Sequence, residues 1–177
     1  SNLIELAPPE IKTEKLLTVM RSRGVEFEDL HTTLDRMEGK KVHVVGDTIV
    51  DSFTYCAMIG GQTKTPTMSV LFEEKKDFIG GAGVVAMHLA AAGAEVTFST
   101  VLGEDALKDF VLEGLSEAGI TCMPVIDASR PTTNKNAIVA ANYRLLKVDT
   151  LDNSSISDEI VGELTSAIET VESDAVI

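Results

Sequence analysis

The sequence predicts an α/β protein with a parallel sheet and a second, smaller β-sheet. Short apolar segments alternate with helical segments from residue 41 to the end of the chain, which is typical of parallel strands joined by crossover helices. Turn residues directly follow the first apolar segment, as expected at the carboxyl edge of a parallel sheet. Residues 53–72 and 133–148 carry strand-forming residues without a helical period, and we expect them to form a lid.

The first 40 residues differ from the rest of the chain. Residues 10–23 read as a helix that Gly24 interrupts, and apolar side chains spaced by three or four predict a second helix over 27–37 that ends at Gly39. This segment contains no candidate catalytic or binding residue, but its apolar stripe must pack on this domain or on a neighbour. We therefore interpret residues 1–40 as a helical connector.

The remaining elements follow in order. We expect strands at 42–45, 95–101, 120–126 and 174–177, a hairpin of 137–141 with 144–148, and helices over 80–93, 105–118 and from Ser157 to Val171. Asp105 and Ser157 are typical N-cap residues, and Gly119 is a typical residue just past a helix end. The last strand lacks partners that would close a parallel sheet, so the domain reads as truncated.

The composition disfavours two classes of partner. The chain has 177 residues, of which 44% are hydrophobic, and a formal net charge of −13. Nucleic acids and anionic membrane surfaces both require clustered Lys and Arg, so we expect neither. No apolar stretch of about 18 residues and no signal peptide is visible, which favours the cytoplasm. Cys56 and Cys122 lack metal-ligand spacing and are interpreted as plain buried thiols.

The first candidate site is the segment Gly46-Asp47-Thr48-Ile49-Val50-Asp51. It leaves the end of a predicted buried strand, where ligands bind in open α/β sheets. A carboxylate at this edge can accept hydrogen bonds from two sugar hydroxyls. The alternative is that Asp47 caps a turn and Asp51 is solvated.

A second candidate is the glycine-rich turn Gly80-Gly81-Ala82-Gly83 ahead of a helix. Glycines leave backbone N–H groups free to face a polar or anionic ligand. The pattern Gly81-x-Gly83-x-x-Ala86 also fits a dinucleotide-binding turn. However, the charged stretch 73–77 is a poor buried strand, and no acidic residue ends the strand after the helix. The glycines could also serve only close packing.

The third group consists of cations near the predicted hairpin. Lys135 follows Pro131-Thr132, and Arg144 and Lys147 lie within the hairpin. They could reach a substrate phosphate, or they could pair with surface carboxylates. The histidines do not cluster, and His88 is interpreted as a satisfied core residue. We expect no metal site.

These segments, in this order, resemble the N-terminal half of a carbohydrate kinase of the PfkB/ribokinase family. The resemblance rests on residues 44–51, 80–82, 85–87, 100–105, 131–132, Lys135 and 145–149, and it covers residues 41–177. Within the family, the chain looks most similar to heptose-7-phosphate kinase-like domains fused to a nucleotidyltransferase. Connector residues 1–40 are consistent with such a fusion.

The resemblance implies a ribokinase-like three-layer fold with a β-sheet lid, truncated at its C-terminal half. It also implies dimers formed through the lid, and ATP with Mg²⁺ as cofactors of the complete domain. Asp47 and Asp51 would bind the sugar hydroxyls, Gly80 and Gly81 would form the sugar-binding turn, and Lys135 would lie near the substrate. The family's Gly-Ala-Gly-Asp segment, which carries the catalytic base, has no counterpart in this chain, so no catalytic residue is expected here.

Two departures from the family pattern keep alternatives open. Val84 stands where the family commonly has Asn, and Ala137 stands where related heptose kinases carry Arg. The leading hypothesis is ATP-dependent phosphorylation of a sugar or sugar phosphate by the parent protein, with this chain binding the acceptor and inactive by itself. The alternatives are a non-catalytic module for dimerisation or sugar-nucleotide sensing, and a dinucleotide-binding oxidoreductase.

Overall fold

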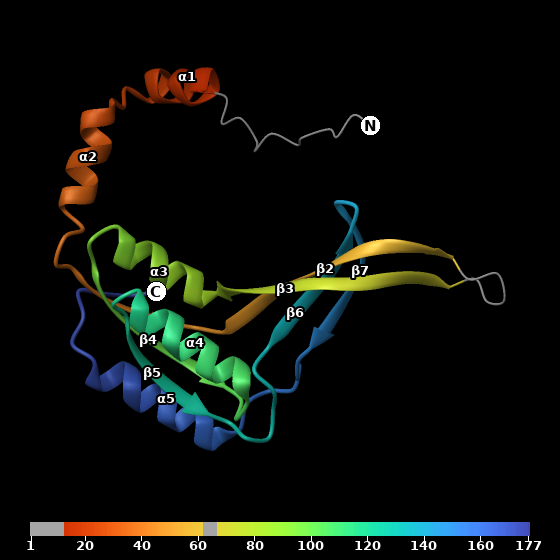
Figure 1. Ribbon diagram of the computed structural model, residues 1–177. Helices are drawn as coiled ribbons and strands as arrows, with labels where there is room; N and C mark the ends of the chain where they lie inside the picture. Colours follow the sequence, from red (N-terminus) through yellow and green to blue (C-terminus); the bar gives the residue numbers. More distant parts are fainter. Residues whose placement is uncertain (1–12, 62–66) are drawn as a thin grey trace.

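The computed structural model describes residues 13–61 and 67–177, which form two sheets and five helices (Figure 1). The helices are α1 (Thr13–Arg23), α2 (Phe27–Asp35), α3 (Ala82–Ala91), α4 (Ala106–Glu117) and α5 (Asp158–Thr170). The strands are β1 (Lys41–Val45), β2 (Thr48–Gly61), β3 (Met68–Gly81), β4 (Glu95–Leu102), β5 (Thr121–Ile126), β6 (Asn134–Ala140), β7 (Tyr143–Thr150) and β8 (Ala175–Val176). The predicted α/β class and the second sheet are confirmed.

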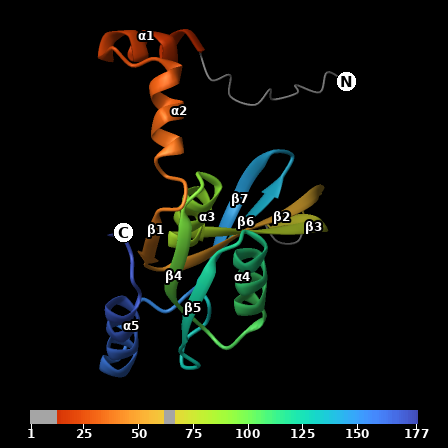
Figure 2. The same cartoon turned by 90° about the vertical axis from the view of Figure 1, so that its left-hand side faces the viewer.

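The main sheet is parallel and has the order β5-β4-β1-β8. Alternate side chains of β1 and β4, among them Val44 and Phe98, face α3 and α4 and form a buried core with Val111 and Leu115. Helix α5 covers the other face of the sheet (Figure 2). Coverage of both faces explains why these strands read as continuous apolar runs.

The second sheet extends from one edge of this body as a lid (Figure 1). Its strand order is β3-β2-β6-β7, in which β2 pairs antiparallel with β3 and parallel with β6. Strand β2 begins at Thr48, directly after β1. The lid is therefore rooted at the carboxyl edge of the main sheet.

Helices α1 and α2 project from the body (Figure 2). Leu16, Phe27, Leu30 and Leu34 are between 42% and 53% exposed, so these members of the predicted apolar stripe are not buried against the described body. The part of the predicted first helix before Thr13 lies outside the described residues. Met37, just past α2, packs against the main core.

The structure corrects the interpretation of His88, whose side chain is exposed. Helix α3 is apolar nearly all round, so composition could not show which face would be buried. Its buried residues are Gly83 and Ala86, and His88 points elsewhere. The buried histidine is His43, whose Nε2 lies 2.8 Å from the Ser99 hydroxyl in the main sheet.

None of the helices in the described part of the chain is long and apolar enough to cross a bilayer. Cys56 is buried, as predicted, and Cys122 is half-buried. Burial raises the pKa of the Cys122 thiol to about 11.

Candidate functional site

The chain passes from the main sheet into the lid at Asp47. The next residue, Thr48, opens β2, and its hydroxyl lies 2.9 Å from the hydroxyl of Thr100 on β4. Both threonines are buried. This buried contact fixes the start of the lid against the sheet, so that Asp47 lies at the edge where open α/β sheets bind ligands.

The paired glycines lie directly beside the two aspartates. Because β3 runs antiparallel to β2, its last residues, Gly80 and Gly81, flank the first residues of β2. A Cβ atom at Gly80 would overlap the Oδ2 atom of Asp51, and one at Gly81 would overlap the carbonyl oxygen of Asp47. Gly81 also has a φ of +60°, which side chains disfavour. A side chain at Gly81 is therefore excluded by the backbone, whereas one at Gly80 would have to displace the Asp51 carboxylate.

Lys135 joins this group through the pairing of β2 with β6. It is in register with Asp51 on the parallel neighbour strand, so both side chains point to the same face of the lid. The row continues to Phe78 on β3 and to Asp149 on β7. Among residues 13–61 and 67–177, neither Asp51 nor Lys135 has an ion-pair partner within 4 Å.

Aromatic rings lie on the same face of the lid, one row further out. The ring of Phe53 packs edge-to-face on that of Phe78, with centroids 6.0 Å apart. The guanidinium of Arg144 lies 5.6 Å from the Phe53 ring centroid. Carboxylate, ammonium and aromatic surface therefore share one face, a combination that suits a polyol with polar edges and apolar C–H faces.

The lid cations divide into paired and unpaired groups. Lys147 pairs with Asp149 at 3.4 Å, and Lys76 pairs with Glu74 at 3.0 Å. For Lys147 the structure thus favours the carboxylate-pairing interpretation. Lys135 is half-buried and lacks such a partner in the described chain, which leaves its ammonium available for a ligand.

A polar cavity of about 330 Å³ adjoins Asp47 at the carboxyl edge. It lies between the root of the lid and the segment that leads from β7 to α5. Its lining residues are Asp47, Thr48, Val101, Arg130, Pro131, Thr133, Asp152, Asn153, Ser154 and Ile156. Of the predicted site residues, Asp47 lines this cavity, whereas Asp51 and Lys135 lie on the lid face.

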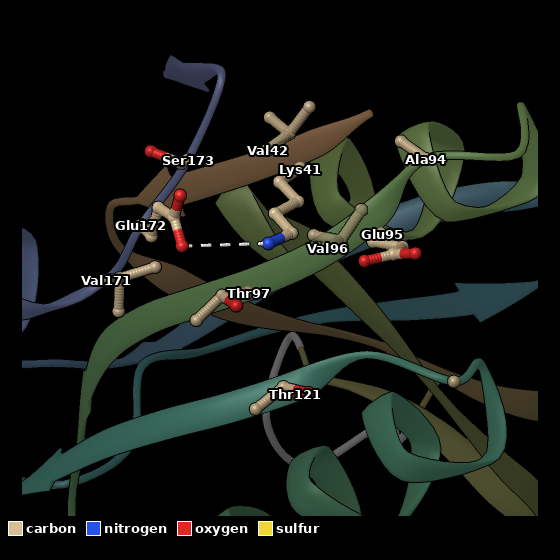
Figure 3. Close-up of a pocket in the computed structure, with 11 residues that line it drawn as sticks. Lys41, Val42, Ala94, Glu95, Val96, Thr97, Thr121, Val171, Glu172 and Ser173 are labelled. Carbon is tan, nitrogen blue, oxygen red and sulfur yellow. Dashed lines mark ion pairs between the residues drawn. The ribbon is translucent and has the colours of Figure 1, made fainter. Parts of the chain in front are cut away.

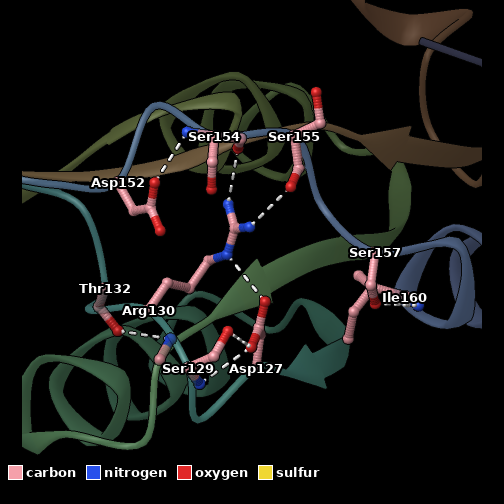
Figure 4. Close-up of polar contacts among 10 residues, drawn as sticks. Asp127, Ser129, Arg130, Thr132, Asp152, Ser154, Ser155, Ser157 and Ile160 are labelled. Atoms are coloured by element: carbon pink, nitrogen blue, oxygen red, sulfur yellow. Dashed lines mark hydrogen bonds and ion pairs between the residues drawn. The ribbon is translucent and has the colours of Figure 1, made fainter.

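Arg130 organises one wall of this cavity, and the sequence did not single it out (Figure 4). Its Nε donates to Asp127 at 2.8 Å, and its terminal nitrogens donate to the carbonyl oxygens of Ser154 and Ser155 at 3.3 and 3.2 Å. Hydrogen bonds from Ser129, followed by those from Arg130, hold the pKa of Asp127 below its ordinary value. Arg130 therefore ties the loop after β5 to the loop before α5.

Asn134 is a second residue to which the sequence alone assigns no role. Its side-chain amide is buried and donates to the carbonyl of Val50 at 2.9 Å and to the hydroxyl of Ser52 at 2.7 Å. These bonds fix β6 against β2 one residue before Lys135. An Asn between turn residues and a predicted strand was the available signal, but its partners lie more than 80 residues earlier in the chain.

A second cavity, of about 470 Å³, lies at the opposite edge of the main sheet (Figure 3). Lys41 and Glu172 form an ion pair across it at 3.8 Å. None of the five predicted site residues lines this cavity, and it is remote from the lid root.

The dinucleotide interpretation is wrong for this fold. Gly81 and Gly83 follow β3, which belongs to the lid and not to the parallel sheet. A dinucleotide-binding turn instead connects a strand of the parallel sheet to its helix.

The described residues do not form a metal centre. Within 13–61 and 67–177, no group of three His, Cys, Asp or Glu side chains is placed to hold a metal ion.

The two departures from the family pattern occupy different environments. Val84, in the first turn of α3, is 37% exposed. Ala137 is buried on the lid and is in register with Phe53 and Lys147. Each position adjoins elements of the candidate site.

Comparison with known proteins identifies the relatives of this chain. The family model described as "pfkB family carbohydrate kinase" matches residues 15–172. The Bifunctional protein HldE of Bradyrhizobium diazoefficiens is 32% identical over 147 residues, which cover 81% of this chain and 29% of that protein. The chain thus spans about three-tenths of the length of this relative and of the Bifunctional protein HldE of Paramagnetospirillum magneticum.

Solved structures show the same fold. Phosphofructokinase-2 from Escherichia coli is 16% identical with a TM-score of 0.58, and the match covers 76% of this chain and 42% of that one. A carbohydrate kinase from Agrobacterium tumefaciens is 22% identical with a TM-score of 0.51, covering 64% and 35% respectively. At these identities the likeness concerns the ribokinase-like fold.

Proposed function

Because this chain belongs to the pfkB family of carbohydrate kinases, we propose that its parent protein phosphorylates a sugar or sugar phosphate with ATP, and that residues 41–177 bind the acceptor. One observation carries this proposal: Asp51 lies against Gly80 and in register with Lys135, so that three strands bring their polar groups to one place. The relatives are longer than this chain, which supports an ATP site formed by residues beyond it.

Each residue has a defined part in acceptor binding. The Asp51 carboxylate accepts hydrogen bonds from two sugar hydroxyls, and the backbone at Gly80 and Gly81 approaches the sugar without side-chain obstruction. Lys135 donates to a further hydroxyl or to an acceptor phosphate. Asp47 binds the acceptor from the side of the cavity at the carboxyl edge. ATP with Mg²⁺ supplies the phosphoryl group, and the catalytic base comes from outside this chain.

Substitution of the site residues tests this function. In the parent protein, Asp51→Asn and Lys135→Met should each raise the acceptor KM about tenfold or more, since a hydrogen bond to a charged group contributes about 1.5–3 kcal/mol. The exposed residues Asp35 and Lys15, on α2 and α1, provide the matched controls Asp35→Asn and Lys15→Met. An unaltered KM in both site variants would refute acceptor binding at this lid face.

We also propose that the lid pairs with the lid of a second copy, in a cytoplasmic homodimer. Its face opposite Asp51 carries an apolar patch of Phe72, Tyr143, Leu146 and Val148, which are between 47% and 76% exposed. A patch of this kind favours association. Leu146→Glu should convert the parent protein from dimer to monomer in analytical ultracentrifugation, and a monomeric wild type would contradict the proposal.

Residues 1–40 are proposed to connect this domain to an upstream one. The exposed apolar side chains of Leu16, Phe27 and Leu30 support a further packing partner. Limited proteolysis of the parent protein tests this: cleavage between Gly24 and Gly39 should release two folded parts.

A non-catalytic module is the second candidate, and Val84 is the observation that favours it. An apolar side chain exposed in the first turn of α3 cannot make the hydrogen bonds that Asn provides to a ligand. In that case the parent protein would bind a sugar nucleotide without consuming ATP. Calorimetric binding of a sugar nucleotide, together with no ADP release in the presence of sugars, would favour the module over the kinase.

A further inference from the structure

The carboxylate of Asp105 bonds to two places that are far apart in the sequence. Its Oδ1 accepts hydrogen bonds from the amides of Leu107 and Lys108, both at 3.1 Å, which confirms the predicted N-cap of α4. Its Oδ2 accepts a hydrogen bond from the amide of Thr132 at 2.8 Å, 27 residues later. The second bond exceeds what an N-cap requires.

Thr132 makes a second hydrogen bond to the same turn. Its hydroxyl accepts from the amide of Gly103 at 3.0 Å, and the residue is 2% exposed. A Cβ at Gly103 would lie 2.5 Å from backbone atoms of Arg130 and Thr132, so glycine is required for the two segments to meet. The turn after β4 and the entry to β6 are therefore joined by two reciprocal bonds.

These bonds lead directly to the candidate acceptor site. The carbonyl of Thr133, the next residue, accepts from the amide of Val50 at 2.8 Å. Strand β6 then starts at Asn134 and places Lys135 beside Asp51. Displacement of Thr132 would therefore shift Lys135 relative to Asp51.

We propose that Asp105 is a positioning residue for the acceptor, in that its Oδ2 bond to Thr132 holds β6 where Lys135 can share a ligand with Asp51. This rests on the proposed function. The Oδ2 bond is charge-assisted, and such bonds are about twice as strong as neutral ones. The N-cap and the lid contact use different oxygens, so one substitution can separate them.

Asp105→Asn is the decisive variant. The amide oxygen of Asn still caps α4, because Asn is as good an N-cap as Asp, whereas the amide nitrogen faces the Thr132 N–H, donor to donor. If the side chain flips, the bond to Thr132 is kept and the cap is lost. Asp105→Ala removes both bonds and shows the size of the purely structural effect. Asp35→Asn, on the projecting helix α2, is the matched control.

Two measurements on the parent protein test the inference. By hydrogen–deuterium exchange, Asp105→Asn should speed exchange at residues 132–135 about tenfold or more, as the loss of a charge-assisted bond predicts, without altering residues 107–112 of α4. With ATP saturating, the acceptor KM should rise by a similar factor while kcat changes less than threefold. Asp105→Ala should speed exchange in both regions.

Three results would overturn the inference. Unchanged exchange at 132–135 in Asp105→Ala, which removes both bonds, would show that Asp105 does not hold β6. Faster exchange at α4 with an unaltered lid root in that same variant would leave Asp105 as a helix cap only. Faster exchange at the lid root with an unaltered KM would show that the contact does not position the acceptor. If the wild-type parent phosphorylates no sugar, the proposed function fails, but the exchange data still decide whether Asp105 holds β6.

Discussion

Replacement of Gly80 by Ala should weaken acceptor binding with little loss of stability. The added Cβ would overlap the Asp51 Oδ2 atom and lie 3.3 Å from the carbonyl oxygen of Ile49. Gly80 does not have a positive φ, so Ala fits its backbone conformation. The carboxylate can rotate away, and an off-rotamer side chain costs about 0.5–1.5 kcal/mol.

Gly80→Ala should cost more free energy in acceptor binding than in unfolding. A displaced carboxylate forfeits hydrogen bonds to sugar hydroxyls, each contributing about 1.5–3 kcal/mol, which corresponds to an acceptor KM raised about tenfold to a hundredfold. Steady-state kinetics of the parent protein would measure KM, and urea denaturation would measure the free energy of unfolding. An acceptor KM within twofold of wild type, in a folded Gly80→Ala variant, would refute the role of Asp51.

The neighbouring glycine provides the contrast. At Gly81 the added Cβ would meet the backbone carbonyl of Asp47, which cannot rotate away, at a φ of +60°. Gly119 has a similar φ of +74° but no atom within 4 Å of such a Cβ. In Gly119→Ala the free energy of unfolding should therefore fall only by the cost of a left-handed backbone, about 1–2 kcal/mol. In Gly81→Ala it should fall clearly more. Equal losses would contradict the close approach of Gly81 to Asp47.

Further predictions concern a core residue, a glycine inside α5, the thiol of Cys122 and the N-cap Asp105. Phe98→Ala, at a fully buried position, should reduce the free energy of unfolding by about 3–5 kcal/mol, measurable by urea denaturation. Gly162→Ala, on α5 with open space around it, should instead raise it by about 0.5–1 kcal/mol, and a loss there would indicate an unseen contact. Because burial raises the pKa of Cys122 to about 11, this thiol should react with iodoacetamide at pH 8 only after unfolding. Burial by itself would raise the pKa of Asp105, but amide hydrogen bonds from Thr132 and α4 outweigh it and leave the pKa below 3.8. The stability that Asp105 contributes is therefore present above about pH 4 and is lost as the pH falls through its folded pKa. Between pH 6 and pH 2 the Asp105→Asn variant should thus lose less stability than wild type, and parallel pH curves would exclude this.

The sequence by itself determined the features that depend on near neighbours along the chain. Asp105 and Ser157 both cap helices as predicted, because an N-cap bonds to amides only two or three residues away. The apolar runs predicted the buried strands of the main sheet because each strand is covered on both faces. The ordered motifs predicted the family, since they occur at fixed places in a common fold.

Tertiary structure decided which side chains meet. Asp51, Gly80 and Lys135 lie on three strands, and only the pairing of β2 with β3 and β6 brings them together. The same applies to the Asp105–Thr132 contact, which no local pattern marks. Strand register and the choice of a buried helix face depend on the packing of the whole chain, so residues distant in sequence become neighbours only when the fold is complete.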